Sequence, residues 1–153
     1  RCRQDFLLGL RLSPERFDVH LPDIIEVAKV ILAAGKIDFL DMSLWDSFKE
    51  PGDEAFKGRS LLSYFTELER GDVALGIAGK LRNPDEVNRA MAAGIDFIML
   101  GRAAILHHDF PLQMQADQNF TPVRNPVSAD YLRAEGLGEA FITYMSGWKG
   151  FVG

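Results

Sequence analysis

Four apolar, strand-like runs alternate with amphipathic helical patterns along this chain, and that alternation constrains the fold more than any other feature. The strand-like runs cover residues 5–14, 37–43, 72–79 and 95–101. Helical patterns follow them at residues 22–35, 58–71 and 83–94, with a short fourth one from Arg102. Strands that alternate with helices indicate βαβ units and a parallel sheet. Apolar side chains on both sides of residues 97–100 predict a sheet that is covered on both faces.

The predicted fold class is therefore α/β. Four βα units can form an open sheet or half of an eight-stranded (β/α) barrel. Such barrels typically need ~250 residues, so the 153 residues of this chain correspond to about one half. A proline-rich, irregular stretch at residues 119–131 precedes a last helix at residues 138–151, and we expect a closing helical tail from about residue 129.

Local signals mark the ends of the predicted helices. Gly35 and Gly71 are expected to close the first two. In the third, Asn83 is expected to cap the helix and Pro84 to occupy its first position. Glu86, three residues after the cap, is expected to complete a capping box.

Composition and charge exclude several classes of function. The formal net charge is -5 and the basic residues are dispersed, so no nucleic-acid partner is expected. No apolar run approaches the ~20 residues of a membrane-spanning helix, so no membrane association is expected. The single cysteine, Cys2, excludes an internal disulfide and a four-cysteine iron–sulfur site, which favours a cytoplasmic location. Because the chain begins Arg1-Cys2-Arg3 without an initiating methionine, we expect a piece of a longer protein.

Two neighbouring strand-like runs end in a glycine followed by a cation: Ala78-Gly79-Lys80 and Gly101-Arg102. In parallel α/β structures, ligands bind beyond the C-terminal ends of the strands. The unpaired N–H groups and the dipole of the following helix favour an anion there. Glycine lets a phosphate approach the main chain, and the cation neutralises it. These residues predict a phosphate site; alternatively, the glycines only let helices start close to strands and the cations are solvated.

Arg11 lies inside the first apolar run, between Leu10 and Leu12. A buried guanidinium needs hydrogen-bond acceptors. An uncharged ring that bears carbonyl and imine groups could supply them. An internal ion pair with Asp41 or Asp38 is the alternative, and the residues alone favour it.

His107, His108 and Asp109 are consecutive and invite a metal interpretation. Adjacent residues on a helix point in different directions, so two neighbouring histidines seldom bind one ion. We therefore expect no metal here and interpret residues 107–111 as a helix-ending surface segment.

Four segments, in sequence order, resemble one family. They are "RLSP" at residues 11–14, "DFLDMS" at residues 38–43, "GIAGKLRNPDE" at residues 76–86 and "GIDFIMLGRAAI" at residues 94–105. Together they are similar to the C-terminal half of the old yellow enzyme family, the FMN-dependent NAD(P)H:flavin oxidoreductases and ene-reductases. The similarity extends from about Leu7 to Pro111, and residues 140–151 resemble the family's closing helix. It implies that residues 1–153 form one segment containing strands five to eight of a (β/α)8 TIM barrel.

The resemblance implies FMN as cofactor and a role for each predicted site residue. Arg11 matches the arginine that bonds the pyrimidine edge of the flavin, where a positive charge stabilises the reduced, anionic form. The loops that hold the FMN phosphate correspond to Ala78, Gly79, Lys80, Gly101 and Arg102. In the family's reaction, NAD(P)H passes a hydride to FMN, which reduces a small-molecule acceptor such as an activated alkene.

The family's substrate-orienting His pair (or His and Asn) and its proton-donating Tyr belong to the first half of the barrel. No catalytic residue is therefore expected within residues 1–153, and we expect this fragment not to turn over by itself. Family members with an iron–sulfur cluster carry clustered cysteines after the last strand. This chain has none there, so it resembles the single-domain type.

Two other functions are compatible with the same residues. One is a different phosphate-binding barrel enzyme that acts on a phosphosugar or a nucleotide. The other is a non-catalytic half-barrel that acts as an interaction module. Unpaired strand edges and an exposed apolar face predict association of such a half-barrel with other copies of itself.

Overall fold

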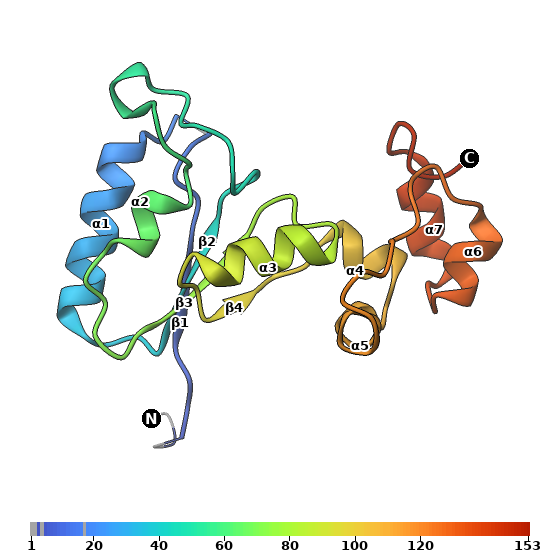
Figure 1. Cartoon of the computed structure of the whole chain (residues 1–153), viewed down its shortest axis with the longest axis horizontal. Helices are drawn as coiled ribbons and strands as arrows, with labels where there is room; N and C mark the ends of the chain where they lie inside the picture. The colour runs from blue at the N-terminus through green and yellow to red at the C-terminus, as the bar shows by residue number, and fades with distance from the viewer. Residues whose placement is uncertain (1–2, 4, 17) are drawn as a thin grey trace. The chain divides into compact units, whose positions relative to one another are not determined.

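The computed structural model describes residue 3, residues 5–16 and residues 18–153, so Cys2 lies outside the described residues. The strands are β1 (Gly9–Leu12), β2 (Phe39–Ser43), β3 (Ala74–Ala78) and β4 (Phe97–Ile98). They form one four-stranded sheet in the order β1-β2-β3-β4, and every neighbouring pair is parallel (Figure 1). The predicted α/β class with a parallel sheet is confirmed.

A helix connects each strand to the next. The connecting helices are α1 (Leu21–Ala34), α2 (Ser63–Thr66) and α3 (Pro84–Ala92). Crossovers between parallel strands of one sheet are almost always right-handed. Because the strands lie side by side in sequence order, right-handed crossovers place all three helices on the same face of the sheet.

The helix-covered face of the sheet is the core of this part of the chain. Its side chains are at most 2% exposed and come from the two central strands: Leu40, Met42, Leu75 and Ile77. The opposite face, which we call the open face, carries Arg11, Phe39, Asp41, Ser43, Gly76 and Phe97. Phe39 and Phe97 meet edge-on there, with ring centroids 5.6 Å apart. Arg11 is exposed and both phenylalanines are only partly buried, so the predicted covering of both faces is wrong.

The first strand is shorter than predicted. β1 begins at Gly9, whereas the apolar run begins at Asp5. Phe6, Leu7 and Leu8 are 57%, 70% and 48% exposed, so their apolar character does not correspond to burial.

The second connecting helix is also much shorter than the predicted residues 58–71. A 3-10 turn (Glu54–Phe56) precedes α2, and α2 has only four residues. The backbone N–H groups of Leu61 and Leu62 donate to the carbonyls of Lys49 and Ser47 instead of to a preceding helical turn. This tertiary pairing overrides the helical pattern.

The third helix begins as predicted. Pro84 is its first residue, and Asn83 Oδ1 accepts a hydrogen bond from Glu86 N–H at 2.9 Å. The capping box is modified, because Glu86 Oε2 accepts from Arg82 N–H at 2.6 Å and not from Asn83.

The chain forms two compact units. The first contains the sheet, in the described residues up to Leu81 and in Val87–Met99; the second comprises Arg82–Glu86 and Leu100–Gly153. The second unit is helical, with α4 (Arg102–Leu106), α5 (Phe110–Ala116), α6 (Ala129–Ala134) and α7 (Glu139–Ser146). Its core consists of Leu106, Val127, Leu132, Ile142, Met145 and Phe151. No helix in the described part of the chain combines the length and apolar character needed to cross a membrane.

Residues 107–111 were predicted as a helix-ending surface segment, and this is only partly correct. His107 does follow the end of α4, but it is 7% exposed and Phe110 is 1% exposed. Phe110 begins α5 and packs edge-on against Phe120 at 5.1 Å. The segment therefore turns the chain into a second helix that contributes to the interior.

Candidate phosphate-binding site

The end of β3 is held against the loop that follows β2. Ser47 Oγ and Ser47 N–H both donate to the Gly79 carbonyl, at 3.0 and 3.2 Å, and Leu44 N–H donates to the Ala78 carbonyl. A Cβ placed on Gly79 would lie 2.6 Å from Ser47 Oγ and 2.9 Å from Ser47 N. Glycine is therefore needed here because the loop after β2 approaches the main chain closely. The sequence had suggested a different reason, the approach of a phosphate.

Lys80 is already paired in this structure. Its Nζ donates to Asp46 Oδ2 at 2.9 Å, and its backbone has a positive φ of 52°. Burial acts to raise the pKa of Asp46, but the hydrogen bonds from Lys80 and Phe48 N–H, with the Lys80 charge, hold that pKa below its usual range. The carboxylate thus stays ionised and competes with any phosphate for Lys80.

Arg11 makes the internal ion pair that the sequence analysis gave as the alternative to a ring ligand. Its Nε lies 3.4 Å from Asp41 Oδ2, and its Nη2 donates to Ser43 Oγ at 3.2 Å. The Arg11 side chain is 54% exposed, so its other N–H donors are not enclosed by the protein. A contact between Arg11 and a flavin stays a prediction.

Asp41 is the buried partner of this pair. Its side chain is 6% exposed, and its Oδ1 has no hydrogen-bond partner among the described residues. Burial raises the pKa of Asp41, and the Arg11 charge only partly offsets this effect.

We expect Asp41→Asn to change the pH dependence of stability. A raised folded-state pKa means that the stability contribution is complete below the ordinary carboxyl pKa of ~3.9 and declines as pH rises through the folded-state value. Asparagine does not ionise, so this decline should be absent in the variant. Urea unfolding midpoints between pH 4 and 7 measure the effect, with the exposed Asp72→Asn as control. Parallel profiles for the parent chain and Asp41→Asn would contradict the explanation.

Strained backbone is concentrated at the C-terminal edge of the sheet. Within the described residues, the non-glycine residues with positive φ are Arg16, Asp18, Trp45 and Lys80. All four lie in the loops that follow β1, β2 and β3. Such conformations cost about 1–3 kcal/mol each and tend to occur at functional sites. This is the edge at which the sequence analysis placed the ligand.

The second unit contains a cavity of about 840 Å³. It is lined by the residues before and at the start of α3, by α4, and by residues 118–125 and 148–151. Four cations contribute to its lining: Arg82, Arg102, Arg124 and Lys149. Within the described part of the chain, none of the four has an ion-pair partner. The cavity is therefore a candidate site for an anion, and its volume lies in the range that small-molecule ligands occupy.

Gly101 and Arg102 begin α4, and Arg102, but not Gly101, lines this cavity. Arg102 is the first residue of α4, and the Gly101 carbonyl accepts from the N–H groups of Ala104 and Ile105. A Cβ on Gly101 would meet no atom within 4 Å. Unlike Gly79, Gly101 thus has open space beside it, as the phosphate interpretation requires.

The predicted site residues are divided between the two units. Arg11, Ala78, Gly79 and Lys80 belong to the first unit, and Gly101 and Arg102 to the second. Arg102 was predicted from the sequence, but the other three cavity cations were not. No spacing or motif links Arg82, Arg124 and Lys149, because they lie in separate segments that only the fold brings together.

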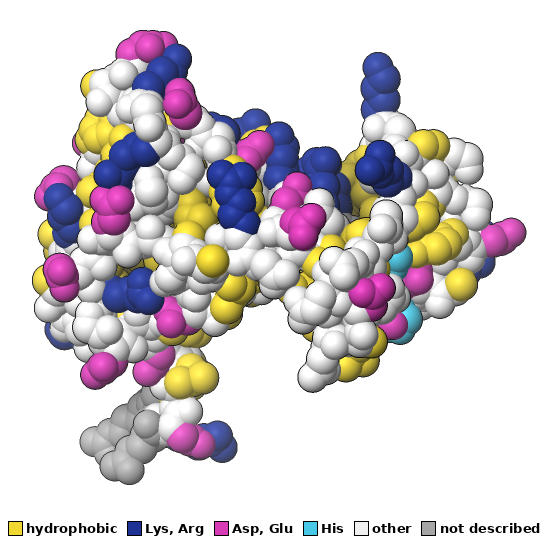
Figure 2. Space-filling model, viewed as in Figure 1, with side chains coloured by type: hydrophobic (Ala, Val, Ile, Leu, Met, Phe, Trp, Pro, Cys, Tyr) yellow, Lys and Arg dark blue, Asp and Glu magenta, His cyan; other side chains and the backbone are white. Residues whose placement is uncertain are grey.

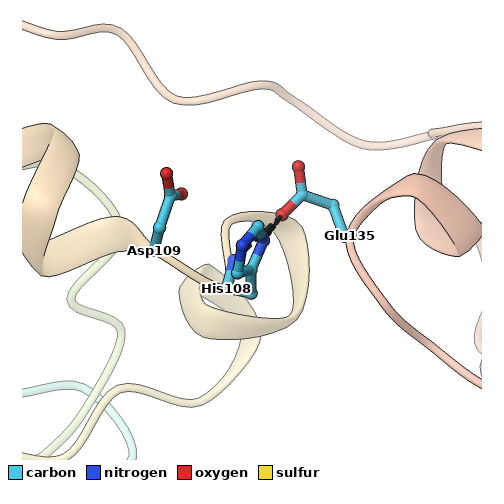
Figure 3. A group of neighbouring side chains, drawn as sticks. All are labelled: His108, Asp109 and Glu135. Carbon is cyan, nitrogen blue, oxygen red and sulfur yellow. Dashed lines mark hydrogen bonds and ion pairs between the residues drawn. The ribbon is translucent and has the colours of Figure 1, made fainter.

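His108 and Asp109 meet Glu135, a residue that the sequence analysis did not connect with them (Figure 3). His108 Nδ1 lies 2.8 Å from Glu135 Oε2, and His108 N–H donates to the same oxygen. The hydrogen bond to Glu135 raises the pKa of His108. Asp109 Oδ1 accepts from Gln113 Nε2 at 2.7 Å. His108 and Glu135 are thus bonded to each other and Asp109 to Gln113, and these contacts account for the arrangement of the three side chains.

Comparison with known proteins adds no family assignment. No protein-family model matches the chain, and no curated protein matches it.

Proposed function

We propose that this chain is the cofactor-holding part of an FMN-dependent NAD(P)H oxidoreductase that resembles the old yellow enzymes. One observation carries the proposal. Arg102, which was predicted from the sequence as a phosphate ligand, lines a cavity together with three other cations, and none of the four has a carboxylate partner among the residues that the structure describes. The terminal phosphate of FMN has the charge and the acceptor oxygens that such a set of donors requires.

The strand order supports the barrel part of the proposal. In an open, doubly wound sheet the strand order reverses at a switch point, where ligands bind. Here four parallel strands follow one another in sequence order without a reversal, which is the arrangement of consecutive strands in a (β/α)8 barrel. We propose that β1 to β4 are the fifth to eighth strands of such a barrel.

The residues present fit the two ends of FMN unequally. The cavity cations fit the phosphate, with Arg102 as the predicted ligand. At the flavin end, Arg11 on the open face has exposed N–H donors, but its guanidinium forms an ion pair with Asp41. When bound, FMN would accept a hydride from NAD(P)H and deliver it to an acceptor such as an activated alkene. The role of this chain is to hold and orient the cofactor; the substrate-orienting residues are expected outside residues 1–153.

The test compares FMN with riboflavin, which lacks the phosphate. We expect the chain to bind FMN more tightly than riboflavin and Arg102→Ala to weaken FMN binding by about tenfold to a hundredfold, since a hydrogen bond to a charged group contributes about 1.5–3 kcal/mol. Riboflavin affinity should not change. Quenching of flavin fluorescence measures both affinities. Arg133→Ala is the matched control, because Arg133 lies in the same unit outside the cavity and is neutralised by Asp130 and Glu139.

Equal affinity for FMN and riboflavin in the parent chain would contradict a phosphate-directed flavin site. An equal loss of affinity in Arg102→Ala and Arg133→Ala would show that Arg102 has no specific role.

A second function is favoured by one observation. Arg11 is paired with Asp41 and Lys80 with Asp46, so the contacts specific for the flavin are weaker than the general anion site. A phosphate-binding barrel enzyme acting on a phosphosugar or a nucleotide would use the same cavity. It would bind these ligands, and after addition of FMN and removal of the unbound flavin by gel filtration it would retain no flavin absorbance.

A further inference from the structure

The cations of the second unit are distributed unevenly. This unit contains five Lys and Arg residues: Arg82, Arg102, Arg124, Arg133 and Lys149. Arg133 donates to Asp130 and Glu139, and these two carboxylates neutralise its charge. The remaining four all line the cavity and have no ion-pair partner among the described residues. Every Lys and Arg of this unit that is not neutralised by a carboxylate therefore lines this one cavity.

The charge at this cavity is opposite in sign to that of the chain. The formal net charge of the whole sequence is -5. Two carboxylates, Asp85 and Glu86, also line the cavity, and Glu86 is occupied by Arg82 N–H at 2.6 Å. Four cations against two carboxylates leave two positive charges, which match a doubly charged anion. In Figure 2, separate Lys and Arg side chains are visible along the upper side of the second unit.

Two of the four cations come from segments that the fold ties together. Arg124 precedes Val127, whose N–H donates to the Phe151 carbonyl, and the Val127 carbonyl accepts from Gly153 N–H. Lys149 lies just before Phe151. The chain around Arg124 is thus hydrogen-bonded to the C-terminal segment around Lys149, which holds the two backbone segments together at the cavity before any ligand binds. Pre-organisation of this kind lowers the entropic cost of binding.

We infer that Arg124 and Lys149 complete the phosphate site that Arg102 begins, so that the C-terminal segment is part of the binding site. The ligand is a phosphate monoester or a pyrophosphate. Arg82, Arg102 and Arg124 offer planar guanidinium groups that can donate two hydrogen bonds each to phosphate oxygens, and Lys149 adds a compact charge. This site is part of the proposed function, and it rests on that function for one point only, that the ligand carries a phosphate group.

Trp148 provides a direct signal, because it lines the cavity next to Lys149. The chain has two tryptophans, and the other, Trp45, lies in the first unit. In a Trp45→Phe background, the fluorescence of Trp148 is therefore recorded alone. The chain is titrated with inorganic phosphate and with pyrophosphate at constant ionic strength, and isothermal calorimetry measures the same affinities independently.

We expect a saturable fluorescence change, with pyrophosphate binding more tightly than phosphate. Arg124→Gln and Lys149→Gln should each weaken binding about tenfold, and the double variant should weaken it further. Both side chains are exposed, so the fold should be kept, and circular dichroism checks this. Lys36→Gln is the matched control: it removes an exposed charge in the first unit and should leave the affinities unchanged.

The possible results separate this inference from the proposed function. Binding of phosphate that depends on Arg102 but not on Arg124 or Lys149 would overturn the inference and leave the proposed function intact. Binding that depends on Arg124 and Lys149, without any preference for FMN over riboflavin, would support the inference and contradict the proposed function. An equal effect of Lys36→Gln and Lys149→Gln, or absence of binding by calorimetry, would overturn the inference.

Discussion

Replacing Gly79 by alanine is expected to lower the free energy of unfolding by about 3 kcal/mol, from overpacking and from weakened hydrogen bonds. The new methyl group would lie 2.9 Å from the backbone nitrogen of Ser47, where a side-chain rotation cannot relieve the contact. Ser47 is fully buried, and both of its hydrogen bonds to the Gly79 carbonyl would be disturbed. Urea denaturation followed by circular dichroism measures the loss.

Gly138→Ala is the matched control for this substitution. Gly138 is the N-cap of α7, with φ of -77°, and a Cβ there would meet no atom within 4 Å, so the change should cost no more than about 1 kcal/mol, because alanine is a poorer N-cap than glycine. If Gly79→Ala were as harmless as Gly138→Ala, the contact with Ser47 would not explain the glycine. The approach of a phosphate would then again be the better explanation for glycine at this position.

Leu132→Ala is expected to destabilise the second unit by about 2–5 kcal/mol. Leu132 lies in α6, is fully buried, and belongs to the core formed with Leu106, Ile142 and Met145. Truncating it removes packed methyl groups and leaves a cavity that the helices around it fill only partly. Leu112→Ala, at a leucine that is 66% exposed, should cost far less.

The same variant connects stability to binding. Arg124 and Lys149 lie on segments that this core supports, so Leu132→Ala should weaken phosphate binding once the second unit begins to unfold. Thermal unfolding with and without pyrophosphate measures both properties in one experiment. A loss of stability equal to that of Leu112→Ala would show that the core described for the second unit is wrong.

The parallel sheet was predictable because its signal is local. Each strand and each connecting helix has its own periodicity, and the alternation between them leaves few topologies. Where tertiary contacts outweigh local preference, prediction failed. Leu61 and Leu62 have helical neighbours in sequence, but their N–H groups bond to residues 47–49. Leu7 is apolar but lies outside the sheet.

The candidate site was predictable only in part, and the two glycine–cation pairs show why. Gly79-Lys80 and Gly101-Arg102 look alike in sequence, yet they have different surroundings. Gly79 meets Ser47, and Lys80 meets Asp46. Gly101 has open space, and Arg102 has no carboxylate partner among the described residues. Which cations remain available depends on contacts more than thirty residues apart, and no local pattern encodes these.

The order of the strands also has a consequence for synthesis of the protein. Each strand lies beside the one made immediately before it, so a nascent chain leaving the ribosome finds its pairing partner already formed. Only one connecting segment has to be looped out at each step, which limits the entropy lost on chain closure. A translational pause between two strands would therefore leave a growing sheet with one free edge, ready for the next segment to dock.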